Sequence, residues 1–112
     1  MMSDKTWKAR ERRICKLFGG TRRGADYADS GGGKSDCIAP GYSIEIKNWS
    51  KPTFAAIVED VRKAEARGSE FDIPFGIMFK KGMRDMDGIV SMRLETFLDW
   101  FVTPVEDFDS EL

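Results

Sequence analysis

The sequence predicts one α/β domain in which a small mixed β-sheet is flanked by helices. Three observations lead to this fold class. The chain has 112 residues, which is enough for one hydrophobic core and too few for two. Apolar residues recur at helical spacing in three segments, and short alternating or continuous apolar runs lie between these segments. The predicted order is therefore α-β-β-α-β-β-α.

Caps and breakers set the boundaries of the expected elements. Ser3 or Asp4 suits the N-cap of the first helix, and two glycines at 19–20 end it. A proline-glycine turn at 40–41 separates the first two strands. In chain order we expect a helix at 4–18, a flexible glycine-rich loop at about 19–34 with room for one short strand, strands at 35–39 and 42–47, a helix at 53–67, strands at 75–79 and 89–92, a helix at 94–101 and an acidic tail at about 104–112.

The second helix should bury one apolar stripe against the sheet, and Gly68 is suited to follow its last turn. The residues of this stripe recur three or four positions apart: Phe54, Ile57, Val58, Val61 and Ala64. The run at 75–79 is apolar at successive positions, which favours a central strand that is buried on both faces.

The net charge of −1 conceals two halves of opposite sign. Residues 1–53 contain 11 Lys/Arg and 6 Asp/Glu, a net charge of +5, whereas residues 54–112 contain 7 and 13, a net charge of −6. A polyanion such as DNA or RNA would bind the basic half through counterion release. The alternative is a solvated helix face.

Composition excludes several classes of function. The chain contains no histidine, so histidine catalysis and histidine metal ligation are excluded, and any metal would be a hard cation on oxygen ligands. No apolar run approaches the roughly 18 residues of a membrane span, so we expect a cytoplasmic protein without membrane association. Cys15 and Cys37 have no metal-binding or redox spacing, and we expect two buried free thiols.

A carboxylate and an ammonium share one face of the strand at 42–47. Glu45 and Lys47 are two residues apart, so their side chains point the same way from a strand. If strands 35–39 and 42–47 form a hairpin, Asp36 lies near that pair. Two carboxylates beside one lysine suit a Mg²⁺ ion. An ordinary solvated strand face is the alternative interpretation.

The first helix adds a third carboxylate. At about 100° per residue from Trp7, Glu11 lies at about 40°, Ile14 at about −20° and Phe18 at about 20°. Glu11 therefore lies within the apolar stripe and is carried toward the sheet. Because a buried carboxylate needs a cation or a metal, Glu11 is a candidate member of the same site, or else it pairs with an arginine at the edge of the stripe.

Glu11 on an N-terminal helix, Asp36 on one strand and Glu45-Ile46-Lys47 on the next resemble the PD-(D/E)XK nuclease superfamily. Over roughly residues 5–80 the chain looks most like the Holliday junction resolvases of archaeal and phage type. Ser35 stands where the superfamily name has proline. The resemblance implies a restriction-endonuclease-like core and a homodimer that cleaves four-way DNA junctions in recombination and repair, in a prokaryotic cell or a phage-infected host.

The resemblance also implies roles for the site residues. Asp36, Glu45 and the backbone carbonyl of Ile46 would hold Mg²⁺, for which Mn²⁺ could substitute, and Glu11 would add a direct, water-mediated or second-ion ligand. Lys47 would orient the attacking water or offset charge on the phosphate.

Nine further residues are candidates for DNA contact because they are basic, or are serines in the glycine-rich loop. They are Lys8, Arg12, Lys16, Arg22, Arg23, Ser30, Lys34, Ser35 and Lys51. The two serines equally suit turn formation. Two other functions stay open: another structure- or sequence-directed nuclease of the same fold, and a DNA-binding module that has lost catalysis.

Overall fold

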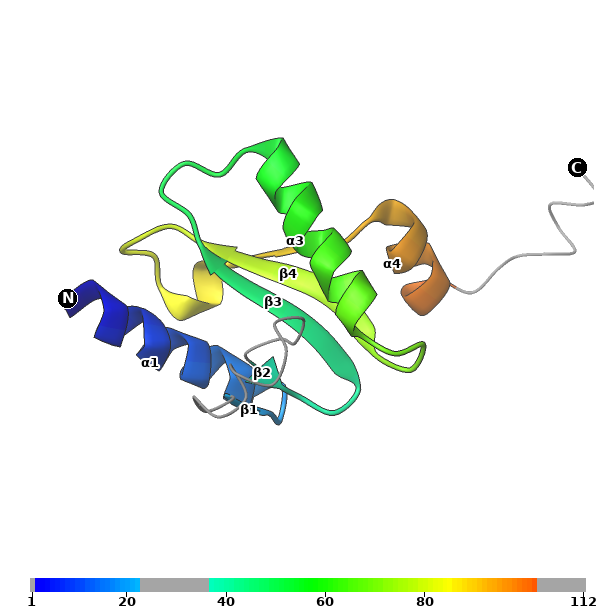
Figure 1. Ribbon diagram of the computed structural model, residues 1–112, viewed down its shortest axis with the longest axis horizontal. Helices are drawn as coiled ribbons and strands as arrows, with labels where there is room; N and C mark the ends of the chain where they lie inside the picture. The colour runs from blue at the N-terminus through cyan, green and yellow to red at the C-terminus, as the bar shows by residue number, and fades with distance from the viewer. Residues whose placement is uncertain (1, 23–36, 103–112) are drawn as a thin grey trace, which may run out of the picture.

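Short strands and helices alternate along the chain (Figure 1). The structure is a computed structural model, and it describes residues 2–22 and 37–102. The elements in these residues are α1 (Met2–Leu17), β1 (Thr21–Arg22), β2 (Cys37–Ile38), β3 (Tyr42–Asn48), α3 (Phe54–Arg67), β4 (Ile73–Phe79), the 3-10 turn η1 (Asp85–Asp87), β5 (Ile89–Ser91) and α4 (Leu94–Phe101).

The parallel pair β3 and β4 forms the centre of the main sheet, and α3 connects the two strands. Their register runs from Tyr42 opposite Ile73 to Asn48 opposite Phe79. Strand β5 pairs antiparallel with β4, which gives a mixed sheet in the order β3-β4-β5. The prediction of a small mixed α/β fold is confirmed.

A second, two-stranded sheet lies beside the main one. Strands β1 and β2 are antiparallel, and β2 meets β3 through one bridge between Ala39 and Tyr42. Gly41 makes this turn with a φ of 87°, a conformation that favours glycine. Strand β1 lies at the start of the expected loop, which the prediction left room for as one short strand. The rest of that loop and the acidic tail from residue 104 lie outside the described residues.

The predicted helix boundaries agree with the observed ones to within about two residues, but the predicted N-cap of the first helix is wrong, since α1 begins at Met2 and includes Ser3 and Asp4. The side chain of Thr53 caps α3 by accepting a hydrogen bond from the amide of Ala56 at 3.1 Å. Gly68 follows the last turn of α3, as expected. Helix α4 has the predicted bounds. Among the described residues, no helix has the length and apolarity required to cross a membrane.

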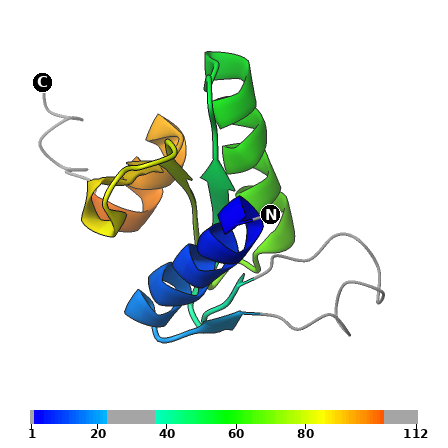
Figure 2. The same cartoon turned by 90° about the vertical axis from the view of Figure 1, so that its left-hand side faces the viewer.

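The core lies on one face of the main sheet, between the strands and α1. Alternation along β3 directs Ile44 to this face, where it packs with Ile14 of α1 and with Phe75 and Phe79 of β4. Helix α3 covers the opposite face. Figure 2 shows α3 on one side of the strands and α4 on the other. The sheet is therefore enclosed from both sides near β3.

The predicted stripe of α3 is wrong at its first turn. Phe54 is 81% exposed and Val58 is also exposed, whereas Asp60, Val61 and Ala64 are buried. The first turn of α3 rises away from the strands in Figure 1. Phe54 therefore stays exposed, whereas Ile57 is half-buried. Helical spacing alone does not reveal where a helix passes the end of its sheet.

The two cysteines are buried as expected, but the prediction of free thiols is wrong. Cys15 of α1 and Cys37 of β2 form a disulfide. Packing of α1 on β2 brings the two side chains together in the core, and this tertiary contact leaves no mark in their sequence spacing. The bond ties the helix that carries Glu11 to the strand that follows Asp36.

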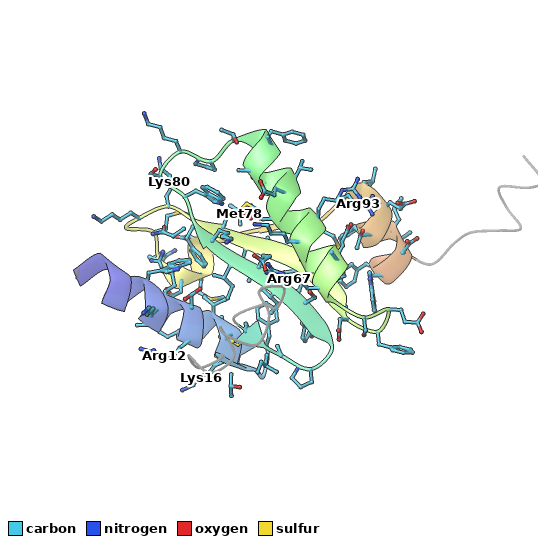
Figure 3. All side chains as sticks on the ribbon, in the orientation of Figure 1. Arg12, Lys16, Arg67, Met78, Lys80 and Arg93 are labelled. Atoms are coloured by element: carbon cyan, nitrogen blue, oxygen red, sulfur yellow. A yellow bond between two sulfur atoms is a disulfide. The ribbon has the colours of Figure 1, made fainter. Side chains whose placement is uncertain are left out.

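A charged cluster holds the start of α4 against α3. Glu65 of α3 accepts hydrogen bonds from Arg93 at 2.8 Å and from the hydroxyl of Thr96 at 2.7 Å. Partial burial raises the pKa of the Glu65 carboxyl, but these hydrogen bonds and the nearby charges of Arg93 and Arg62 outweigh that effect, so the pKa is lowered overall. Figure 3 shows Arg93 on the α4 side of α3.

Loss of the disulfide should lower the free energy of unfolding by about 3 kcal/mol, because the bond closes a loop of 22 residues in the unfolded chain. Chemical denaturation with and without dithiothreitol measures this difference. The Cys15→Ala/Cys37→Ala variant is the control, since its midpoint should not respond to dithiothreitol. Equal stability of the reduced and oxidised wild type would contradict a disulfide in the protein.

Glu65→Gln should lower the free energy of unfolding by about 1–2 kcal/mol at neutral pH. Because folding lowers the pKa of Glu65, its contribution is fully present above the usual value of 4.5 and is lost as the pH falls through the folded-state pKa. The difference between the variant and the wild type should therefore shrink in acid. Glu95→Gln is the matched control, since Glu95 binds the same Arg93 from an exposed position and should change stability little.

Candidate active site

Strand β3 carries polar and apolar side chains on opposite faces. Ile44 and Ile46 face the core beside α1. Ser43 faces α3, where its hydroxyl donates to the backbone carbonyl of Ala64 at 2.6 Å. Glu45 lies on the same α3 face. The predicted alternation of β3 is therefore present. Its polar face packs against helix α3 and does not face solvent.

Glu45 is a buried carboxylate with two cationic partners. Its side chain is 6% exposed, and one oxygen accepts a hydrogen bond from the guanidinium of Arg67 at the end of α3. The other oxygen lies 3.8 Å from the Nζ atom of Lys47. Figure 3 shows Arg67 lying between α3 and β3. Removing a carboxylate from water is costly, so these two cations stabilise Glu45 in place.

Glu11 is buried on α1, as its place in the apolar stripe predicted. Its helical neighbours Ile14 and Cys15 belong to the core on the α1 face of the sheet. Glu45, by contrast, lies on the α3 face. The two carboxylates therefore approach the sheet from opposite sides, and a common site would have to form around the edge of β3.

The edge of β3 is open at this point within residues 2–22 and 37–102. Its pairing with β2 ends at the bridge of Tyr42 with Ala39, so no described strand pairs with the outer edge from Ser43 to Asn48. Asp36, the third predicted carboxylate, lies outside the described residues. A reactant or an ion could reach Glu45 and Lys47 along this edge, since the Lys47 side chain is 39% exposed.

The donor atoms that are described suit a hard cation only in part. Glu45 supplies carboxylate oxygens, and Ile46 supplies the neighbouring backbone carbonyl. No group of three His, Cys, Asp or Glu residues that could hold a metal is found within the described part of the chain. A complete ligand set would therefore need Asp36 as well.

A second cluster fixes α1 against η1. Arg13 donates to both oxygens of Asp85, at 2.6 and 3.0 Å, and Arg10 donates to the same carboxylate at 3.2 Å. The pKa of the Asp85 carboxyl is lowered, chiefly by its hydrogen bonds from Arg13. Desolvation opposes this effect, and the positive charges of Arg13 and Arg10 add to it. Arg10 also lies 4.7 Å above the ring of Phe79. These contacts fix the rotation of α1 and hence the burial of Glu11.

The predicted DNA-binding residues fall into two groups. Lys8, Arg12, Lys16 and Lys51 are exposed and available to a polyanion. Arg12 and Lys16 point away from the body of the molecule in Figure 3. Arg22 lies in β1, and its side chain is not described. The remaining candidates, Arg23, Ser30, Lys34 and Ser35, lie outside the described residues.

Sequence reasoning missed two residues beside Glu45 on the α3 face. Arg67 pairs with Glu45, and Asp60, which is buried, accepts a hydrogen bond from the indole of Trp49 at 3.1 Å. A signal was present. One side of α3 carries residues at helical spacing, namely Asp60, Ala64 and Arg67. Glu11 has a comparable place within the apolar stripe of α1. Helical spacing therefore places both residues on one side of α3, whereas the contact of Arg67 with Glu45 depends on how α3 packs along β3.

Comparison with protein-family models, with curated proteins and with solved structures found no match for this chain.

Arg67→Gln should lower the free energy of unfolding by about 2–3 kcal/mol, because it leaves the buried Glu45 with only the more distant Lys47 as a countercharge. Adding Glu45→Gln to this variant should recover much of the loss. Urea denaturation of the two single variants and the double variant measures the coupling. The control is Arg62→Gln on the same helix, whose side chain is 61% exposed. Purely additive losses would show that the pair does not stabilise the fold.

Proposed function

We propose that this chain is a metal-dependent DNA endonuclease of the PD-(D/E)XK type that cleaves four-way junctions as a homodimer. The observation that carries the proposal is the carboxylate–lysine pair on β3. Glu45 is held inside the fold next to the half-exposed Lys47, at the open strand edge described above. An exposed ion pair would be expected on an ordinary solvated strand face.

The arrangement of the elements supports the proposed restriction-endonuclease-like core. An N-terminal helix precedes an antiparallel turn into β3, and a helix then leads to a parallel neighbour, β4. The motif residues Glu11, Asp36, Glu45 and Lys47 follow one another along the chain in the order that the resemblance implies. Helices α1 and α3 pack on the two faces of β3, the strand that carries Glu45 and Lys47. This packing holds the strand rigidly, as catalytic side chains require.

In this proposal the residues divide the work of phosphodiester hydrolysis. Asp36, Glu45 and the carbonyl of Ile46 would hold Mg²⁺ or Mn²⁺, with Glu11 as a further ligand. The ion would supply charge neutralisation at the phosphate and a more acidic water. Lys47 would orient the attacking water or stabilise charge on the phosphate oxygens. Arg67 would hold Glu45 in position from the α3 side.

DNA would approach along the basic side of α1. Lys8, Arg12 and Lys16 are exposed on this helix, whereas Arg10 and Arg13 bind Asp85 and are less available to phosphate. The acidic C-terminal half of the sequence would face away from the nucleic acid. Of the other basic candidates, Arg22 lies in β1, and Arg23 and Lys34 belong to the segment between β1 and β2.

One observation favours a DNA-binding module without catalysis. Glu45 already has two cationic partners, Lys47 and Arg67, so its burial does not by itself require a metal. In this second candidate function the ion pairs are structural, and only the basic surface acts on DNA. The two functions differ in whether a divalent ion binds at Glu45.

Cleavage assays on four-way junctions, flaps and linear duplexes test the proposal. Wild type with Mg²⁺ should cut junctions, whereas Glu45→Gln, Asp36→Asn and Glu11→Gln should cut at least about 100-fold more slowly while still binding DNA. Preference for flaps or linear DNA would instead identify another nuclease of this fold. Wild-type turnover by Glu45→Gln would exclude the proposed site.

Two measurements separate catalysis from binding. Mn²⁺ titration followed by electron paramagnetic resonance should detect an ion that Glu45→Gln no longer holds, and no binding by wild type would favour the non-catalytic module. Arg12→Ala/Lys16→Ala should reduce affinity for every DNA shape and lower the slope of log K against log salt by up to about 2, since each phosphate contact contributes about 0.9. Its single-turnover rate at saturation should remain close to that of wild type.

A further inference from the structure

Helix α4 exposes the apolar stripe that an amphipathic helix normally buries. Leu94, Phe97, Leu98 and Phe101 recur at i, i+3, i+4 and i+7, so they form one stripe along the helix. Each of them is between 44% and 72% exposed. The polar contacts of Glu65 hold only the N-terminal end of α4, and its apolar side is left open.

An apolar groove lies between this stripe and the sheet. Its volume is about 690 Å³, and its walls come from α4, from the sheet and from the end of α1. Phe97 and Phe101 line one side, and Phe18, Phe75 and Val90 line the other. Figure 2 shows α4 standing beside the strands on the side away from α3.

Strand β5 forms the edge of the sheet beside this groove, where Val90 lines the groove and Ile89 points to the opposite face of the sheet. Ile89 and Val90 are each about 60% exposed, and within residues 2–22 and 37–102 no strand pairs with the outer edge of β5. An apolar edge strand of this kind readily pairs with another chain. We call this surface the α4–β5 surface, and it comprises Ile89, Val90, Leu94, Phe97, Leu98, Trp100, Phe101 and Val102.

The area of the α4–β5 surface matches one side of a stable dimer interface. Aromatic side chains have roughly 150–250 Å² each, so the exposed fractions of these eight residues correspond to an apolar area on the order of 800 Å². This area equals the roughly 800 Å² per partner of a standard interface, to which an edge strand contributes side chains from both of its faces.

We propose that a second copy of this chain docks on the α4–β5 surface, with β5 pairing against β5 of the other copy and α4 of each copy covering the open groove. Two identical edge strands pair antiparallel about a twofold axis, so one surface of this kind is self-complementary. The polar positions of α4 that flank the stripe are acidic, Glu95 and Asp99, which disfavours nucleic acid or an anionic membrane as the occupant.

This dimer does not depend on the proposed nuclease activity. It rests on the exposure of α4 and β5, and it would form equally in a non-catalytic DNA-binding protein. The proposal adds to the homodimer expected from the family resemblance a specific surface and a twofold axis near β5. Loss of the dimer and loss of cleavage are therefore measured independently.

Sedimentation velocity of the full chain tests the proposal. Wild type at about 100 μM should sediment with twice the 12.7 kDa mass of one chain. Val90→Lys and Phe101→Lys should each raise the dissociation constant at least about 100-fold, because a lysine would be placed in the middle of an apolar interface. Leu17→Lys is the matched control, since Leu17 is 61% exposed on α1 outside the surface and its replacement should leave the dimer unchanged.

Circular dichroism and thermal unfolding of each variant establish that it is folded before its mass is interpreted. A second readout is hydrogen exchange, in which the amides of residues 89–101 should be more protected at high than at low concentration. A wild-type monomer, or a dimer that persists in both folded lysine variants, would overturn the proposal. Concentration-independent protection in a monomer would overturn it too, and would identify residues 103–112 of the same chain as the occupant.

Discussion

Burial of β3 on both faces is the constraint on which the rest of this fold depends. The core beside α1 covers Ile44, and α3 covers the face that carries Glu45. This enclosure buries Ser43 and Glu45, whereas Lys47, farther along the same face, keeps 39% of its side chain exposed. Each of the two buried polar groups needs a partner from α3, which the backbone carbonyl of Ala64 and the guanidinium of Arg67 provide. The same enclosure strengthens the electrostatic interactions of the Glu45 carboxylate, because the dielectric constant is lower inside the protein than in water.

The ion pairs around Glu45 are consistent with a structural role and with a catalytic one, and the two roles are not exclusive. A metal ligand must be deprotonated and correctly oriented before the ion arrives. The ion pairs with Arg67 and Lys47 restrict the position of the Glu45 carboxylate. The same cations oppose a divalent ion through like-charge repulsion. Whether orientation of Glu45 or repulsion of the ion is stronger decides between the nuclease and the non-catalytic DNA-binding module. A measurement of divalent-ion binding therefore distinguishes the two functions, whereas the fold does not.

Local signals allowed most of the fold to be predicted from the sequence, and tertiary contacts account for what was missed. The extent of α3, the turn at Gly41 and the bounds of α4 follow from short-range chemistry. The burial of Glu11 followed from helical spacing. The disulfide between Cys15 and Cys37 and the exposure of Phe54 depend on how α1 and α3 lie against the strands, and periodicity does not encode that placement. In the candidate site, the placement of Glu45 and Lys47 on one face of β3 could be predicted from the sequence. The contact of Arg67 with Glu45 could not, because it depends on the packing of α3 along β3.

Charge and apolarity divide the surface into two regions with different partners. Exposed cations of α1, Arg12 and Lys16 among them, lie on one side, where a polyanion would be attracted. Val90 and the exposed apolar residues of α4 lie on the other side of the sheet from α3, with acidic neighbours that repel a polyanion. Under the two proposals, a single small domain would bind DNA with one region and its own copy with the other. Dimerisation through β5 would leave α1 of each copy free, so that two basic surfaces and two β3 edges would be related by one twofold axis. A junction with two symmetry-related strands is a substrate that such an arrangement would fit.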